Sequence, residues 1–157
     1  MKIQFWSVGK AHDSYTKEGV ETFTKRIAHY YPVEWKIFPP PKNAASFSED
    51  QLKKNEATRL LNGMQPDDIV VALDENGIQW TSTDLASFLV KNSNRSVKNV
   101  IFLIGGAYGL HTTIFKRSNY TWSLSKLVFP HQLVRLILSE QVYRSCTIIR
   151  NEKYHHS

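Results

Sequence analysis

The stretch "IFLIGGAYGL", residues 101–110, decides the fold, because an apolar strand runs directly into a glycine turn. Gly105 and Gly106 end the apolar run, and Gly109 follows after two further residues. Glycine lets a backbone turn tightly and lets a ligand approach it closely. The spacing differs from the G-x-G-x-x-G of dinucleotide-binding proteins, and no Gly-Lys-Ser/Thr of a P-loop follows. The stretch therefore predicts either an ordinary strand-to-helix turn or a ligand-binding turn of another kind.

On both sides of this turn, segments of strand and helix periodicity alternate. Ser48 and Gln51 form a capping box at one helix start, Thr81 or Ser82 caps another, and Asn76-Gly77 is expected to turn the chain. Such alternation predicts an α/β fold, in which a mainly parallel sheet lies between helices, and a single domain over residues 1–157. Strands are expected at 3–8, 33–38, 68–74, 100–106 and 120–125, and helices at 13–30, 48–62, 81–89, 112–116 and from about 130 onward.

In sheets of this type, ligands bind beyond the carboxyl ends of the strands. Three such ends are chemically suggestive: Leu73-Asp74, Gly105-Gly106 and the segment 124–129. No Lys or Arg stands beside the glycine turn, so a multiply charged phosphate does not suit it. An adenosine-type ligand without phosphate fits better, with adenine between apolar side chains and backbone groups reading its edge.

The composition and the net charge favour some classes of protein and argue against others. The formal charge of +6 suits a partner that carries phosphates, such as RNA, although many basic proteins never bind nucleic acid. No apolar run approaches the roughly 20 residues of a membrane span, and the first ten residues resemble a strand rather than a signal peptide. The single cysteine, Cys146, can form no internal disulfide and is expected to be buried and inert. We therefore expect a cytoplasmic protein.

The last helix is apolar around more than half of its circumference, which exceeds what one sheet face needs. Either it lies deep in a core, or one side packs on the sheet and the other on a partner subunit; we favour a homodimer. Its apolar residues are Leu133, Val134, Leu136, Ile137, Leu138, Val142 and Tyr143.

Polar groups near the end of the sequence are the other candidates for chemistry. Tyr154, His155 and His156 can donate, accept or shuttle protons, although a solvated tail would carry the same residues. Arg135 and Arg144 could bind RNA phosphate or form ion pairs, and the sequence does not decide between these roles. No pattern of a catalytic nucleophile or of a metal site is present, since the histidines are scattered.

The ordered set of segments resembles the RlmH family of ribosomal RNA methyltransferases over essentially the whole chain. The segments are "LIGGAYGL", then "SNYTWSLSKLVFPHQLVRLILSEQVYR", then Tyr154-His155, preceded by "VGK", "EGVETFTKRI" and "VVALDENGIQW". The resemblance implies a SPOUT fold with a deep C-terminal trefoil knot, S-adenosylmethionine as cofactor and a homodimer. It also implies methylation at N3 of a pseudouridine of 23S rRNA in assembled 70S ribosomes.

Residue by residue, the resemblance places the cofactor on Leu73, Gly105, Leu124, Ser125, Lys126, Leu127, Val128 and Phe129. It makes Tyr154 and His155 candidates for the target pocket, with His155 as a hypothetical general base for the N3 proton and Tyr154 as a positioning group.

RNA contacts are assigned to Arg135, Arg144 and His156, the last standing where relatives often have Lys or Arg. Two alternatives stay open: a SPOUT transfer-RNA methyltransferase, and a ribosome-binding factor without catalysis.

Overall fold

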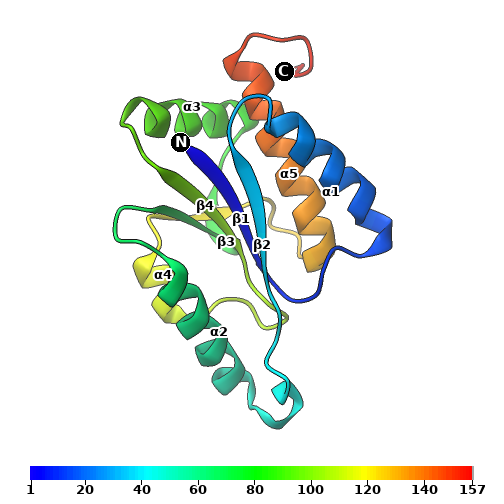
Figure 1. Cartoon of the computed structure of the whole chain (residues 1–157), viewed down its shortest axis with the longest axis vertical. Helices are drawn as coiled ribbons and strands as arrows, with labels where there is room; N and C mark the ends of the chain where they lie inside the picture. The colour runs from blue at the N-terminus through cyan, green and yellow to red at the C-terminus, as the bar shows by residue number, and fades with distance from the viewer. Residues whose placement is uncertain (157) are drawn as a thin grey trace.

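The computed structural model describes residues 1–156 and contains one five-stranded sheet in the order β2-β1-β4-β3-β5 (Figure 1). Every neighbouring pair of strands is parallel, which confirms the predicted α/β class. The strands are β1 (Lys2–Val8), β2 (Val33–Phe38), β3 (Ile69–Gln79), β4 (Asn99–Ile104) and β5 (Tyr120–Ser123). The helices are α1 (Ser14–Ile27), α2 (Glu49–Gly63), α3 (Ser82–Asn94), α4 (Thr112–Arg117) and α5 (His131–Ile149), with a 3-10 turn, η1, at Ala44–Ser46.

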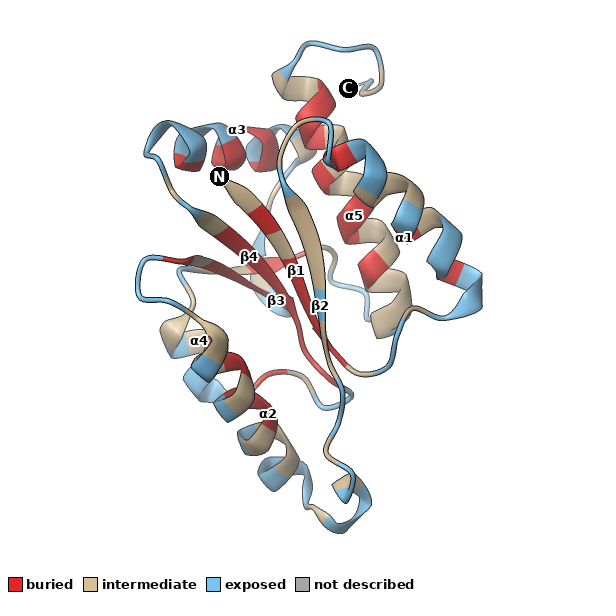
Figure 2. Ribbon diagram, viewed as in Figure 1, coloured by how far each residue is buried: buried red, intermediate tan, exposed pale blue. Residues whose placement is uncertain are grey.

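Two apolar cores lie on the two faces of the sheet, because side chains alternate between the faces along each strand. In β4, Val100 and Phe102 join the core under α1, α3 and α5, whereas Ile101 and Leu103 join the core under α2 and α4. Figure 2 shows the buried residues concentrated along the central strands and on the inward sides of the helices. The sheet is therefore covered on both faces, and its carboxyl edge is where a ligand can enter.

Helix α5 lies between α1 and α3 in one layer (Figure 1). Its contact with α1 is close, since a Cβ atom built on Gly19 would lie 2.6 Å from Cδ1 of Leu136. The sheet and two flanking helices thus account for much of the apolar circumference of α5, and this circumference alone does not require a partner subunit. None of the helices within residues 1–156 is long and apolar enough to cross a membrane.

The predicted turn at Asn76-Gly77 is wrong, because β3 continues through it to Gln79. The pairing with β5 shifts register here, so that Leu73 and Ile78 both lie opposite Trp122. A Cβ atom on Gly77 would lie 2.6 Å from the carbonyl oxygen of Thr121, so glycine at this position lets the two strands approach within a bulge.

Other boundaries differ by a few residues. The first helix ends at Ile27 rather than near residue 30, and β5 ends at Ser123 rather than at residue 125. The predicted capping box of Ser48 and Gln51 is confirmed, and Thr81 forms a second box with Asp84.

Candidate functional site

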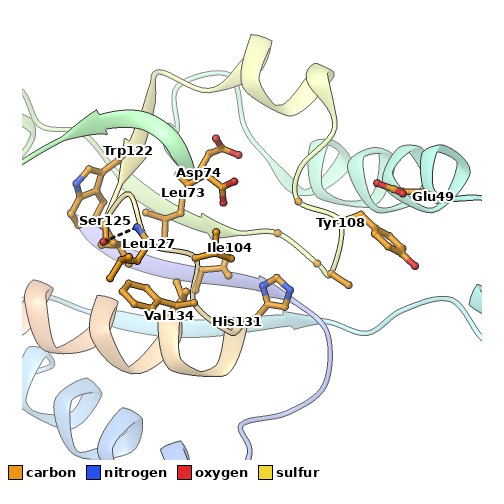
Figure 3. A pocket seen from close by; sticks show the side chains of 18 residues that line it. Glu49, Leu73, Asp74, Ile104, Tyr108, Trp122, Ser125, Leu127, His131 and Val134 are labelled. Carbon is orange, nitrogen blue, oxygen red and sulfur yellow. Dashed lines mark hydrogen bonds between the residues drawn. The ribbon is translucent and has the colours of Figure 1, made fainter.

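A pocket of about 460 Å³ opens at the carboxyl edge of the sheet (Figure 3). Three segments supply most of its wall, and they are the three strand ends that the sequence singled out. The lining residues are Leu73, Asp74, Glu75, Ile104, Gly105, Gly106, Ala107, Tyr108, Gly109, Trp122, Leu124, Ser125, Leu127, Val128 and Phe129, with Glu49 from α2 and His131 and Val134 from α5. Of the predicted cofactor residues, only Lys126 is outside this wall.

The glycine turn forms one side of the pocket. The backbone N–H of Gly109 donates to the carbonyl of Gly106 over 3.0 Å, and Gly109 has a φ of +80°. A Cβ atom on Gly105 would lie 2.9 Å from Cγ of Leu110 and 3.0 Å from the carbonyl carbon of Gly109. The turn therefore leaves no room for a side chain at Gly105, and its backbone borders the pocket directly.

The loop after β5 forms the opposite side. Ser125 holds it in shape, since its carbonyl accepts from the hydroxyl of Ser123 over 2.8 Å and its own hydroxyl accepts from the N–H of Leu127 over 3.0 Å (Figure 3). Leu127 is 70% exposed and Val128 is 76% exposed, so apolar side chains stand free at the mouth of the pocket. Such exposed apolar groups commonly mark a surface that binds a ligand or a partner.

The electrostatics of the wall favour a cation. Three carboxylates, those of Glu49, Asp74 and Glu75, line the pocket, and none of its lining residues is a Lys or an Arg. Burial and the neighbouring Arg135 guanidinium lower the pKa of His131, so its imidazole adds no positive charge at neutral pH. A ligand with several phosphates would be repelled here, whereas a positively charged ligand would be attracted.

One buried donor in the wall has no acceptor. The indole Nε1 of Trp122 has no hydrogen-bond partner among residues 1–156, although the ring is stacked on Trp80 with centroids 5.2 Å apart. Over the same described range, no three His, Cys, Asp or Glu side chains are grouped to hold a metal ion.

The predicted catalytic residues Tyr154 and His155 do not lie in this pocket. They follow the end of α5, whereas the pocket contacts its first residue, His131. Nineteen residues of helix span about 28 Å, and Figure 1 places the C-terminus beside the last turn of α5, away from its first residue. The structure brings Tyr154 instead to Glu140, whose Oε1 accepts from the Tyr154 hydroxyl over 3.2 Å.

The three predicted RNA contacts lie in different environments. Arg135 is fully buried and its Nε donates to the hydroxyl of Ser7 over 2.9 Å, which argues against a phosphate contact because the guanidinium does not reach the surface. Arg144 is partly buried and pairs with Glu140 over 2.6 Å, whereas His156 is exposed. Sequence reasoning missed Glu140, although its spacing of four residues from Arg144 is a signal of a helical ion pair.

The family described as "Predicted SPOUT methyltransferase" matches residues 1–155.

The chain belongs to the SPOUT methyltransferase family.

Within the SPOUT methyltransferases, several relatives match nearly the full length. A protein of Cytophaga hutchinsonii is 47% identical, covering 99% of this chain and 100% of the relative, and one of Parabacteroides distasonis is 39% identical, covering 99% of each. Both are named "Ribosomal RNA large subunit methyltransferase H", and the resemblance to the RlmH family is thereby confirmed. Membership of a methyltransferase family implies a methyl-donor cofactor.

Among solved structures, a methylase family protein from Neisseria gonorrhoeae matches with a TM-score of 0.53 and 14% identity. The match covers 99% of this chain and 85% of the other. At this identity it supports the SPOUT fold alone.

Proposed function

We propose that this SPOUT protein transfers a methyl group from S-adenosylmethionine to N3 of a pseudouridine in 23S rRNA, in the assembled 70S ribosome, and acts as a homodimer. The observation that carries the proposal is the pocket at the glycine turn. It is acidic and lacks Lys and Arg in its wall, and it belongs to a chain 47% identical to a ribosomal RNA large subunit methyltransferase H. The basic charge of +6 suits a partner rich in phosphate.

The residues present fit this cofactor. Bound adenosylmethionine supplies a methyl group on a positively charged sulfonium. Asp74 and Glu75 offer that positive charge a favourable field, while Leu73, Leu124 and Leu127 offer adenine an apolar slot. The backbone at Gly105 borders the pocket directly, and its polar groups can fix the orientation of the ligand. The absence of phosphate-binding side chains in the wall agrees with a cofactor that carries no phosphate.

A homodimer would unite the two parts of the site. Tyr154 contacts Glu140, nine residues or about 14 Å of helix beyond His131, and neither Tyr154 nor His155 lines the pocket of its own subunit, so we assign them to the pocket of another copy. The exposed Leu127 and Val128 give a second subunit an apolar surface to cover at the mouth of that pocket. We therefore place the target base between the pocket of one subunit and the tail of its partner.

In this arrangement the protein contributes mainly alignment. The pocket would hold the methyl donor, and the tail together with the ribosomal surface would hold the base, so that the two reactants would meet between the subunits. Fixing two reactants in this way removes much of the entropic part of the barrier. The N3 proton must leave before or during the transfer. Among the tail residues, His155 has the side chain that most often acts as a general acid or base.

Methyl transfer from labelled adenosylmethionine tests the proposal. The acceptors are unmodified assembled ribosomes, isolated large subunits, naked ribosomal RNA and bulk transfer RNA, with the modified base then mapped. We expect label on assembled ribosomes alone, at N3 of one pseudouridine. Label in transfer RNA would overturn the substrate, and ribosome binding without any label would favour a non-catalytic binding factor.

A matched variant pair makes the pocket itself testable. Leu124→Arg places a positive charge in the wall and should abolish cofactor binding, whereas Lys126→Ala changes a neighbour outside the wall and should leave it unchanged. Equal binding by both variants in calorimetry would contradict the placement of the cofactor.

A further inference from the structure

The tail after α5 is folded back on the helix by a defined turn. Asn151 adopts a φ of +55°, its N–H donates to the carbonyl of Ile148, and the N–H of Glu152 donates to the carbonyl of Thr147. This pair of hydrogen bonds around a left-handed residue is the Schellman motif. The hydroxyl of Tyr30 donates to Glu152 over 2.7 Å and anchors the turn. Tyr154 and His155 consequently return along α5 instead of leaving it.

Glu140 receives the returning tail. Its Oε1 accepts from the Tyr154 hydroxyl over 3.2 Å and from Arg144 at Nη2 over 2.6 Å and at Nε over 3.0 Å. Its Oε2 accepts from Nε2 of Gln141 over 2.8 Å. The Tyr154 ring lies against the Arg144 guanidinium, 4.7 Å from Cζ to the ring centroid, and edge-on to Tyr143. These contacts hold Tyr154 at both its ring and its hydroxyl.

Arg144 also reaches His155, with its Nη1 3.5 Å from Nδ1 of the imidazole. A guanidinium only donates and stays charged, so the imidazole nitrogen that faces it must present a lone pair. A proton on Nδ1 would point at a positive charge, and Coulomb repulsion disfavours it. In the neutral imidazole of His155 the proton therefore lies on Nε2.

We propose that Glu140 and Arg144 are positioning residues that fix Tyr154 and hold His155 as the Nε2–H tautomer, so that His155 donates a hydrogen bond to the target base and does not take its proton. The inference rests on the proposed function and replaces the general-base role expected from the sequence.

The chemistry of the target agrees with a donor. N3 of pseudouridine lies between two carbonyl groups, and loss of its proton spreads negative charge onto their oxygens. An N–H aimed at one of these oxygens stabilises that charge as it forms. The N3 proton passes to solvent hydroxide, and the electron pair left on N3 forms the new bond to the methyl carbon as the carbon–sulfur bond breaks.

The first test needs no substrate. Nitrogen-15 NMR of the imidazole rings distinguishes the two neutral tautomers, and His155→Gln assigns the His155 signals by their disappearance. We expect the Nε2–H pattern in the wild-type dimer and a mixture of tautomers in Arg144→Met. A wild-type ring protonated on Nδ1, or a pattern unaffected by Arg144→Met, would overturn the inference even if the protein methylates its target as proposed.

The second test compares two replacements of His155 in single-turnover methyl transfer on ribosomes. Glutamine keeps an N–H donor near the place of Nε2 but cannot act as a base, whereas alanine provides neither. We expect His155→Ala to lose about 10²-fold or more, as for other lost transition-state donors, and His155→Gln to recover most of that loss. Equal loss in both variants would return His155 to the role of base.

The positioning role of Glu140 has its own signature. Glu140→Gln should lower the single-turnover rate while the affinity for adenosylmethionine stays at the wild-type value, because Glu140 is not part of the pocket wall. Glu21→Gln, an exposed glutamate on α1, is the matched control and should change neither quantity. A Glu140→Gln enzyme with the wild-type rate and the wild-type tautomer of His155 would remove Glu140 from the network. If the wild type itself transfers no methyl group, the proposed function fails and the NMR result still decides the tautomer.

Discussion

Gly105 shows how one residue shapes the pocket, because the carbonyl carbon of Gly109 and the side chain of Leu110 occupy the space that a Cβ atom would need. We predict that Gly105→Ala destabilises the fold by about 1–3 kcal/mol, the usual cost of overpacking, and weakens cofactor binding. Thermal unfolding and calorimetry measure the two effects.

Gly109 supplies the control for this prediction. No atom lies within 4 Å of its would-be Cβ, and Asn tolerates its positive φ better than most residues. Gly109→Asn should therefore keep most of the stability. Unfolding temperatures that fall equally in the two variants would mean that backbone conformation, and not the missing space, limits this turn.

Cys146 gives a second prediction that concerns a single residue. Burial in the core under α5 raises the pKa of its thiol to about 12, so neither access nor ionisation favours reaction. We expect no labelling of the folded protein by a thiol reagent at pH 8 and one equivalent after unfolding in urea. Rapid labelling without denaturant would show that this core opens readily.

Individual residues also show what the sequence could and could not predict. The glycines and leucines of the pocket followed from their places at strand ends, since a parallel sheet gathers its carboxyl ends on one edge. Arg135 could not be placed in this way, because a buried arginine and a surface arginine on a helix have the same local pattern. The acceptor role of Glu140 depends on a tail that returns along the helix, and no spacing in the sequence reveals that return.

Among the elements, the end of α5 makes the clearest prediction, because Asn151 must adopt a left-handed conformation for the tail to turn back. Asn151→Gly should be neutral, whereas Asn151→Val should cost about 1–2 kcal/mol and release the tail. We expect the valine variant to bind adenosylmethionine normally and to transfer methyl groups slowly, with the glycine variant as the control. Slow transfer by both variants would point to the Asn151 side chain itself.

The helices and strands also show which features depend on neighbours in the sequence and which depend on tertiary contacts. The helix start at Ser48 was predictable because a capping box is a contact between neighbours. The continuation of β3 past Gly77 was not, since it depends on how closely β5 approaches. The Asn-Gly pair favours a tight turn by itself, and here the neighbouring strand overrides that preference.

At the scale of the whole molecule, the distance between tail and pocket predicts complementation between subunits. A mixture of His155→Ala and Leu124→Arg subunits should recover activity, because a mixed dimer contains one intact pocket that faces one intact tail. Random mixing of equal amounts would give about a quarter of the wild-type activity. The measurement is methyl transfer by the mixture against each parent variant, after light scattering has established that both form dimers. No recovery would place the tail in the site of its own subunit.

The arrangement of the whole chain was less predictable from the sequence than its individual elements. Element periodicity predicted a mainly parallel sheet between helices but not the strand order β2-β1-β4-β3-β5, because pairing depends on contacts between distant segments. The deep trefoil knot implied by the resemblance stays a prediction, and no local signal in a sequence reports it.

The three carboxylates at the pocket have a consequence for turnover. With adenosylmethionine as donor, the sulfur is cationic before the reaction and a neutral thioether after it. Glu49, Asp74 and Glu75 therefore attract the spent cofactor less than the fresh one, by a margin that added salt reduces. The same charges thus favour binding of the fresh cofactor and release of the spent one. Because salt weakens binding of the fresh cofactor more than binding of the spent one, inhibition by the accumulated product should become stronger as ionic strength rises.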